Sequence, residues 1–436
     1  MKIYYLIRSI GTFISYLLLF HKQAHKSQEA IRVWQFKQLK ALIQYAWEHI
    51  PFYRKYWEQA GFSPSQFHSL EDMELIPFID KNTVREHREE MLNPTYAKNR
   101  LSLVTTGGTT GMPLQFYIDN FVARAKELAF GYWYGKHYWG YLDRIHKIAV
   151  LRGARIDEDK IKHRIFWQKS TRDHGLVFSS FHITEENYTL YLSKLRDYKP
   201  RFIKAYPSSI VAFCTLMKRH GDYGLEGLRG VICSSENVYE SHRKLICETL
   251  GVEIYSYYGH SEKAVAACQD GHRMVFQPCY GYTEFINDEG KKTVRRGEIA
   301  QVVATSLGNY YFPFIRYKTN DLIEVDDAEA SIAKRILGRA QEFVIDKDGN
   351  KVIFTCADEI FWELKGIVAY QYVQEEQGKL GLYLQVDRDF SQSTLQVVRD
   401  AVQQMFFNFE IKVSIVERIE KTKAGKFRYL IQGLDL

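Results

Sequence analysis

The stretch RFIKAYPSS, residues 201–209, decides the fold, because it is a short apolar run that ends abruptly in polar and turn-forming residues. Residues 210–220 follow with helical spacing of their apolar side chains, and RGVICSSE (residues 229–236) repeats the first pattern. A strand, a helix and a second strand in this order predict neighbouring parallel strands of one sheet.

The same alternation extends outward on both sides. KIAVLRG (residues 147–153) and VEIYSYYG (residues 252–259) are predicted strands, and residues 239–250 form a predicted helix between them. In parallel sheets, ligands bind outside the carboxyl ends of the strands. We therefore expect four polar or Gly-containing segments to converge on one crevice: residues 105–111, 206–209, 234–236 and 257–262.

Different patterns precede and follow this region. Apolar residues recur every three or four positions up to about residue 95, which predicts helices, and residues 275–335 are rich in predicted strands and turns. The pattern after the predicted domain joint indicates, in chain order, a hairpin at residues 345–352, a strand at 380–386, a helix at 395–407 and a strand at 411–417. The predicted fold class is α/β, with a large N-terminal domain that includes a small β subdomain, and a small, mobile α+β C-terminal domain. The predicted boundaries are 1–95, 96–338 and 339–436.

Composition describes an ordinary globular chain. Of 436 residues, 46% are hydrophobic and 25% are charged, and the length implies two or three domains or subdomains. The net charge of +7 favours anionic small ligands or an acidic membrane surface and is too diffuse to indicate nucleic acid. Six cysteines without a CxxC pair are typical of reduced thiols, so we expect a cytoplasmic protein.

Residues 3–20, IYYLIRSIGTFISYLLLF, are apolar but contain Arg8, Ser9, Thr12 and Ser15. A membrane-spanning helix needs about 20 apolar residues, and a signal peptide needs a small-residue cleavage site, so neither is expected. Basic residues surround the segment and no acid precedes Glu29. Two alternatives remain: a helix lying on the cytoplasmic leaflet of the membrane, and a helix packed on the protein's own surface.

The loop TTGGTTGMP, residues 105–113, follows the apolar run LSLV. Glycines allow successive backbone N–H groups to point into one concavity, and threonine hydroxyls add further donors. This composition predicts a loop that holds phosphate oxygens. It is not the P-loop of the NTPases, because the required Lys is absent, so its positive charge must come from a metal ion or a distant basic residue. The alternative is a flexible surface turn.

Carboxylates follow two of the predicted strands. Glu262 ends the motif YGHSE after a glycine turn and could hold Mg²⁺, which keeps few protein ligands; the alternative is a cap on the next helix. Asp321 ends RYKTND and could accept both hydroxyls of a ribose, while Asn320 suits a turn position with positive φ. The turn at Ser234, Ser235 and Glu236 is a similar signal and is just as weak by itself.

Two basic segments lie near the C-terminal domain. Arg339 sits at the predicted domain joint and could contact the same sugar or phosphates. KTKAGKFR (residues 421–428) is a glycine-containing loop that offers Lys426 as the distant charge that the phosphate loop lacks. The alternative is an ordinary basic tail.

Cys268, His272 and Cys279 could supply three ligands of a structural zinc site. Their spacing fits no standard zinc finger, and a fourth ligand is not evident. The alternative is a pair of ordinary buried cysteines.

The order and kind of these segments resemble the adenylate-forming superfamily of acyl-CoA ligases, aryl-CoA ligases and luciferases. TTGGTTGMP, YGHSE, RYKTND, LGR and KTKAGKFR match its five motifs in order. YAWEHIPFYRKYWEQAGF, LIPFIDKNTVREH and KPRFIKAYPSS are similar to the phenylacetate–CoA ligase and coenzyme F390 synthetase branch, and most of all to its capsular polysaccharide biosynthesis members.

The resemblance implies a role for each matching residue. Lys426, Glu262 and Thr109 would be catalytic: Lys426 would reach the carboxylate and the α-phosphate, and Glu262 would hold Mg²⁺. The residues implied to bind ATP are Thr105, Thr106, Gly107, Gly108, Thr110, Gly111, Ser235, Glu236, Tyr258, Gly259, Asp321 and Arg339. Three departures are present: no Lys follows Pro113, Asn320 replaces Gly, and Gln341 stands at the hinge position.

The implied activity is ATP- and Mg²⁺-dependent activation of a carboxylic acid as its adenylate, followed by transfer to CoA. Transfer to the amine of a sugar precursor is the alternative acceptor chemistry and suits the capsule resemblance. A rival of another class is a non-catalytic nucleotide-binding scaffold in polysaccharide assembly. The presence of Glu262, Asp321, Arg339 and Lys426 together argues against the scaffold.

Overall fold

The computed structural model describes residues 2–434 except 97, 106–113, 143, 172, 294, 340–342, 354–360, 362–363 and 423–426. The chain forms two compact units, and each unit contains two separate parts of the sequence. Unit 1 contains residues 1–143 and 257–336, and unit 2 contains residues 144–256 and 337–436. Strand β8 (Glu253–Gly259) spans the boundary, since its first half pairs with β7 and its last three residues pair with β9. The three-part division expected from the sequence remains a prediction.

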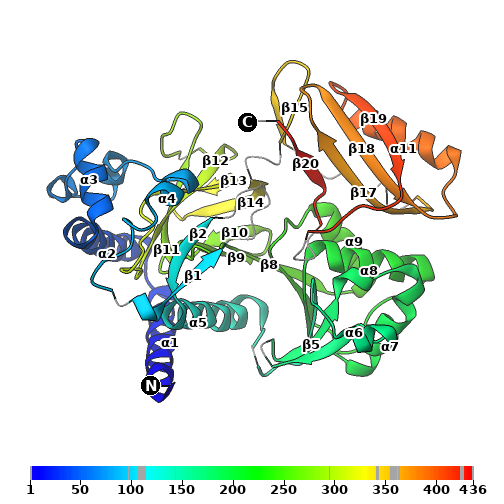
Figure 1. The fold of residues 1–436 in the computed structure, drawn as a ribbon, viewed down its shortest axis with the longest axis horizontal. Helices are drawn as coiled ribbons and strands as arrows, with labels where there is room; N and C mark the ends of the chain where they lie inside the picture. Colours follow the sequence, from blue (N-terminus) through cyan, green and yellow to red (C-terminus); the bar gives the residue numbers. More distant parts are fainter. Residues whose placement is uncertain are drawn as a thin grey trace. The chain divides into compact units, whose positions relative to one another are not determined.

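Unit 1 begins with helices and ends with an antiparallel sheet (Figure 1). Its helices are α1 (Lys2–Ala24), α2 (Gln28–His49), α3 (Pro51–Gln59), α4 (Lys81–His87) and α5 (Asn120–Trp139). Its sheet contains, in spatial order, β11 (Gly281–Ile286), β12 (Ile299–Ser306), β13 (Tyr317–Asp327), β14 (Ile332–Arg339), β10 (Arg273–Phe276) and β9 (Ala266–Asp270). Large side chains from both parts, among them Trp57, Phe67, Phe285 and Phe314, form one buried core. These strands confirm the predicted β subdomain.

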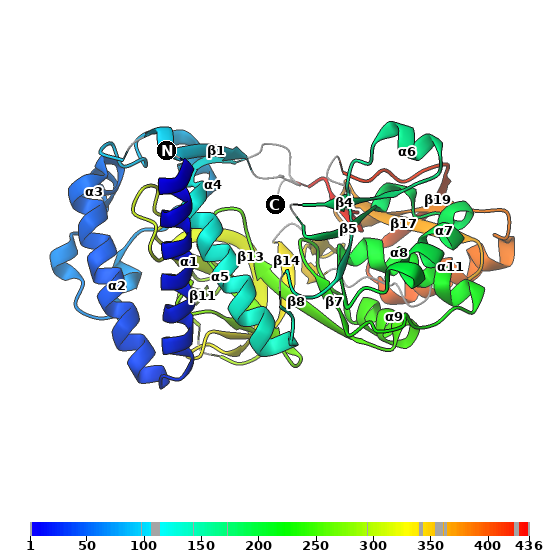
Figure 2. The ribbon, with the colours of Figure 1, turned by 90° about the horizontal axis from the view of Figure 1, so that it is seen from below.

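Helix α1 runs beside α5, as Figure 2 shows. One of its faces packs on α5 through aromatic rings: the Phe20 centroid lies 5.4 Å from that of Tyr134 and 6.5 Å from that of Phe130. The segment therefore packs on the protein's own surface, while its other face is exposed. No helix in the described part of the chain is long and apolar enough to cross a membrane.

Unit 2 contains the predicted parallel sheet. Its strands are β3 (Ile148–Arg152), β5 (Gly175–Ser179), β6 (Phe202–Ala205), β7 (Gly230–Cys233) and the first half of β8, all parallel, with β4 (Trp167–Ser170) antiparallel at one edge. Its helices are α6 (Glu158–Lys162), α7 (Tyr188–Tyr198), α8 (Pro207–His220) and α9 (Glu240–Leu250). Strands β3, β6 and β7 are buried almost throughout, which explains their near-continuous apolar runs. The α/β prediction is confirmed here.

The C-terminal part of unit 2 has its own core. A hairpin of β15 (Phe343–Ile345) and β16 (Lys351–Ile353) precedes a sheet of β17 (Ile367–Gln374), β18 (Lys379–Val386), β19 (Glu410–Val416) and β20 (Leu430–Gln432). Helix α11 (Gln392–Met405) lies beside this sheet (Figure 1). Its Leu395, Val398 and Val402 belong to one buried core with the leucines of β18. The predicted hairpin, strands and helix of this part are confirmed.

One element differs from the expected sheet. Strand β1 (Leu101–Thr105) is not a strand of the parallel sheet, because it pairs antiparallel with β2 (Gln115–Asp119) in a separate two-stranded sheet. The pair Thr105 and Gln115 closes this hairpin, so the glycine-rich segment connects two antiparallel strands.

Candidate active site

Two segments of unit 1 carry the predicted carboxylates, and the fold brings them together. Tyr258 and Gly259 end β8, and the turn that follows is closed by a hydrogen bond from the Lys263 N–H to the His260 carbonyl oxygen at 3.2 Å. Glu262 lies in this turn. Asp321 lies far along the chain, in β13.

Two hydrogen bonds join these segments in opposite directions. The Tyr258 hydroxyl donates to Asp321 Oδ2 at 2.6 Å, and the Tyr317 hydroxyl donates to Glu262 Oε1 at 2.9 Å. Each segment thus supplies one tyrosine and one carboxylate. Hydrogen bonds to ionised groups are stronger than neutral ones and fix the orientation of the acceptor. The two carboxylates are therefore held in place before any ligand binds.

A bulge in β13 directs Asp321. The pairing of β12 with β13 shifts register between Gln301 and Val303, so residues 319–321 stand out of the regular ladder. Asn320 adopts a φ of 65°, in the left-handed region that was expected for it. The Thr319 hydroxyl accepts the Asp321 N–H at 3.1 Å and donates to the Val302 carbonyl oxygen at 2.8 Å. Bulges of this kind re-aim side chains, and this one fixes the Asp321 backbone.

Glu262 is buried, with 5% of the residue exposed, and yet it is ionised. Burial raises the pKa of a carboxyl group, but here His260, the backbone and Tyr317 outweigh burial and lower the pKa of Glu262 to about 2. His260 Nδ1 lies 3.2 Å from Glu262 Oε2, at ion-pair distance. An ionised buried carboxylate is a suitable ligand for Mg²⁺.

Tyr258 is held by the same network. Burial, followed by the neighbouring charge of Asp321, raises the pKa of Tyr258 well above its ordinary value, so the hydroxyl stays protonated. The expectation that Tyr258 and Gly259 lie against adenine stays a prediction.

Only the first residue of the predicted phosphate loop is described. Thr105 is the last residue of β1 and is exposed. The other predicted members, Thr106, Gly107, Gly108, Thr109, Thr110 and Gly111, lie outside the described residues.

In unit 2, Glu236 has a structural role that the sequence did not indicate. Its Oε2 accepts the Ser208 N–H at 2.9 Å, and its Oε1 accepts the Ser208 hydroxyl at 3.1 Å. Ser208 is the second residue of α8, so the carboxylate caps the positive end of that helix. Ser235, just before it, adopts a φ of 73°. The strained turn after β7 thus places Glu236 at the start of α8.

The C-terminal loop is anchored on both sides at the carboxyl edge of the parallel sheet. The Lys421 ammonium donates to the Ser180 carbonyl oxygen at 2.6 Å, directly after β5, and burial lowers the pKa of Lys421. The Phe427 N–H donates to Glu236 Oε1 at 3.1 Å, after β7. Lys426 itself lies outside the described residues. The ends of its loop are nevertheless fixed at the edge where such sheets bind ligands.

The hinge region is described only in part. Gly338 has a φ of 106° and Arg339 is the last residue of β14, but the Arg339 side chain and Gln341 lie outside what the structure describes.

The predicted zinc site is not formed. Cys268 and Cys279 belong to a buried apolar cluster with Phe130 and Tyr280, whereas His272 is exposed in the turn between β9 and β10. Burial raises the pKa of both thiols, which disfavours the thiolate that zinc needs. Among the described residues, no group of three or more His, Cys, Asp or Glu could hold a metal ion. The alternative, ordinary buried cysteines, agrees with this structure.

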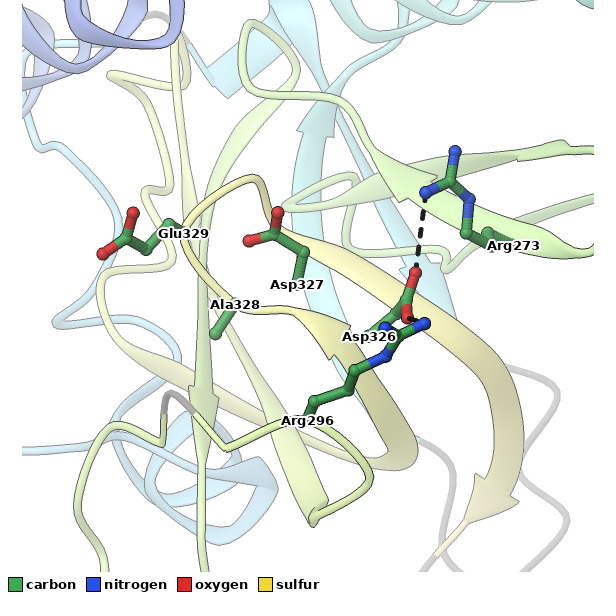
Figure 3. Close-up of a pocket in the computed structure, with 6 residues that line it drawn as sticks. All are labelled: Arg273, Arg296, Asp326, Asp327, Ala328 and Glu329. Carbon is green, nitrogen blue, oxygen red and sulfur yellow. Dashed lines mark ion pairs between the residues drawn. The ribbon is translucent and has the colours of Figure 1, made fainter.

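A hollow of about 370 Å³ lies elsewhere in unit 1, next to the turn between β13 and β14. The Asp326 carboxylate lies between the guanidinium groups of Arg296, at 2.7 Å, and Arg273, at 3.6 Å (Figure 3). Asp327 and Glu329 add two more carboxylates. None of the predicted site residues lines this hollow, and its excess of carboxylates does not suit a triphosphate.

Three contributors to the site were missed from the sequence. Tyr317 and His260 hold Glu262, and Lys421 anchors the C-terminal loop. Tyr317 and His260 both lie inside motifs that were singled out, so proximity to a predicted carboxylate was an available signal. Nothing in the sequence pairs Lys421 with Ser180, because 241 residues separate them.

Comparisons with known proteins find similarity to CapK and to CoA ligases. The family described as CapK C-terminal domain matches residues 344–433. Protein CapK of Staphylococcus aureus is 20% identical over 92% of this chain and 89% of its own length. The phenylacetate-coenzyme A ligase of Thermus thermophilus is 25% identical over 81% of this chain and 80% of its own length.

Solved structures show the same fold. A 2-hydroxyisobutyryl-CoA ligase in the postadenylation state superposes with a TM-score of 0.68 and 20% identity, covering 91% of this chain and 88% of that protein. An anthranilate CoA ligase in complex with anthranoyl-AMP gives a TM-score of 0.51 and 18% identity, covering 74% of this chain and 64% of that protein. The predicted fold, a large N-terminal domain and a small C-terminal one, is confirmed.

Proposed function

We propose that the chain is an adenylate-forming ligase of the branch that contains the phenylacetate–CoA ligases and CapK, and that it activates a carboxylic acid with ATP and transfers the acyl group to CoA. One observation carries the proposal: the two tyrosine–carboxylate hydrogen bonds that hold Glu262 and Asp321 between the YGHSE and RYKTND motifs. A non-catalytic scaffold has no need of two carboxylates preorganised in this way.

In the first half-reaction, a carboxylate oxygen of the acid attacks the α-phosphorus of ATP. The bond from the α-phosphorus to the bridging oxygen breaks, and pyrophosphate leaves with that electron pair. Glu262 is the residue that would hold Mg²⁺, which when bound neutralises phosphate charge. Asp321 accepts hydrogen bonds from the ribose hydroxyls, and Lys426 neutralises the charge that develops between the carboxylate and the α-phosphate.

In the second half-reaction, the thiol sulfur of CoA attacks the acyl carbon and gives up its proton to solvent, and AMP leaves with the oxygen that came from the acid. Lys426 and the acceptor would occupy the same side of the adenylate, so the C-terminal domain swings about the joint near Arg339 between the two steps. The hydrogen bonds from Lys421 to Ser180 and from Phe427 to Glu236 belong to one of the two positions of this domain.

An amine is the second candidate for the acceptor of the acyl group. The sequence resembles capsular polysaccharide biosynthesis members of this branch, and protein CapK is similar along 92% of this chain, so we propose a place in surface polysaccharide metabolism. The acceptor there would be an amine of a sugar precursor, and the product an amide.

The experiment is ATP–pyrophosphate exchange over a broad panel of carboxylic acids, followed by incubation with CoA or amino sugars and mass spectrometry of the products. We expect exchange that depends on one class of acid and on Mg²⁺. Absence of exchange with every acid, from protein that binds ATP, would overturn the proposal. An amide in place of a thioester would change the acceptor only.

A further inference from the structure

Helix α1 has an exposed apolar ridge opposite its packed face. Ile10, Ile14 and Leu18 are 50%, 47% and 62% exposed. They are four residues apart, so they lie above one another along the helix. Exposed apolar side chains that stand singly are ordinary, whereas an aligned set on one helix is a feature of an interaction surface.

The polar group beside this ridge is satisfied within the helix. The Ser15 hydroxyl donates to the Gly11 carbonyl oxygen at 2.8 Å. A hydroxyl that bonds its own helix can enter an apolar environment without losing a partner. Gly11 adds no side chain next to the ridge.

Charge identifies what the ridge contacts. The first 28 residues contain Lys2, Arg8, Lys22 and Lys26 and no Asp or Glu. Lys22 lies four residues after Leu18, in the last turn of α1, and is exposed, as is Lys26. If a second copy of the chain docked through this segment, its basic residues would face the basic residues of the first copy and repel them. An anionic surface supplies the opposite charge.

We propose that the ridge of Ile10, Ile14 and Leu18 lies in the headgroup region of a bilayer that contains anionic lipid, with Lys22 and Lys26 at the phosphates. The helix lies along the membrane surface and stays packed on α5, so the enzyme binds the membrane without inserting a span. This inference does not depend on the reaction that the enzyme catalyses.

The test is co-sedimentation of the full-length protein with vesicles of phosphatidylcholine alone, and with vesicles in which a quarter of the lipid is phosphatidylglycerol. We expect binding to the anionic vesicles only. Each basic residue near such a surface contributes about fivefold to the partition coefficient, so Lys22→Gln with Lys26→Gln should weaken binding about 25-fold. Ile14→Ser with Leu18→Ser should weaken it on the order of tenfold.

The matched control is Val397→Ser with Phe407→Ser, since these apolar residues are 48% and 82% exposed in the C-terminal part of unit 2. The control should bind vesicles as the unaltered protein does. The proposal is overturned if the unaltered protein does not sediment with anionic vesicles, or if ridge and control variants bind equally. It is also overturned if the ridge variant changes only the oligomeric state, which would make the face a contact between copies of the chain.

Discussion

Tyr317→Phe is the change that isolates the preorganisation of Glu262. It removes only the hydroxyl that donates to Glu262 Oε1 at 2.9 Å, from a ring that is fully buried beside Phe314. A hydrogen bond to a charged group contributes about 1.5–3 kcal/mol. At 1.4 kcal/mol for each factor of ten, the Mg²⁺ concentration for half-maximal ATP–pyrophosphate exchange should rise about 10- to 100-fold.

The change in Mg²⁺ dependence expected for Tyr317→Phe differs from a loss of activity caused by protonation of Glu262. Its pKa is about 2, and loss of 1.4 kcal/mol of stabilisation raises a pKa by about one unit. The carboxylate therefore remains ionised at neutral pH in the variant, and a higher pH should not restore activity.

Tyr53→Phe is the matched control. Tyr53 is equally buried, and its hydroxyl donates to the Pro313 carbonyl oxygen at 2.6 Å, away from any carboxylate. It should lower the free energy of unfolding without altering the Mg²⁺ dependence. The reasoning is refuted if Tyr317→Phe shows the Mg²⁺ dependence of the unaltered enzyme, or if both variants shift it equally.

Three further predictions concern other parts of the chain. Lys426→Ala should lower adenylate formation about 10²–10³-fold in single-turnover assays and leave transfer from a preformed adenylate intact; equal loss of both steps in folded protein would contradict its role. Tyr258→Phe removes the donor 2.6 Å from Asp321, so the KM for ATP should rise about tenfold with little change in kcat, and an unchanged KM would count against the ribose assignment. Burial lowers the pKa of Lys126 from 10.5 to about 7, so the unfolded chain binds more protons between those values and the free energy of unfolding should rise with pH there, by up to about 1.4 kcal/mol per unit. Urea titrations at pH 7 and 9 should show that slope, and Lys126→Met should abolish it.

The sequence predicted the parallel sheet well because burial on both faces produces a strong signal. Strands β3, β6 and β7 are nearly continuous apolar runs, and the helices between them have regular spacing. Strand β2, QFYID, is short and only partly buried, so its pairing with β1 was not predicted. In a half-exposed hairpin, the alternation of apolar and polar residues is little stronger than in a loop.

The sequence indicated which residues belong to the site, but not which of them contact each other. The motifs identified Glu262 and Asp321 but not the tyrosine that donates to each, because each of these tyrosines lies in the other motif. That Glu236 binds the nucleotide stays a prediction; its capping of α8 was not foreseen, because the turn at Ser235 brings it to Ser208 only in the folded chain. Such pairings depend on long-range packing, which local sequence patterns do not contain.

The most direct measurement follows oxygen from the acid into the products. With both carboxylate oxygens of the acid labelled as ¹⁸O, attack on the α-phosphorus and release of the acyl group must leave one labelled oxygen in AMP. Mass spectrometry of the nucleotide after turnover with the acceptor should find a single ¹⁸O in AMP and none in pyrophosphate. ADP as the product, with the label in inorganic phosphate, would show that the acid attacks the terminal phosphate and would contradict the adenylate account.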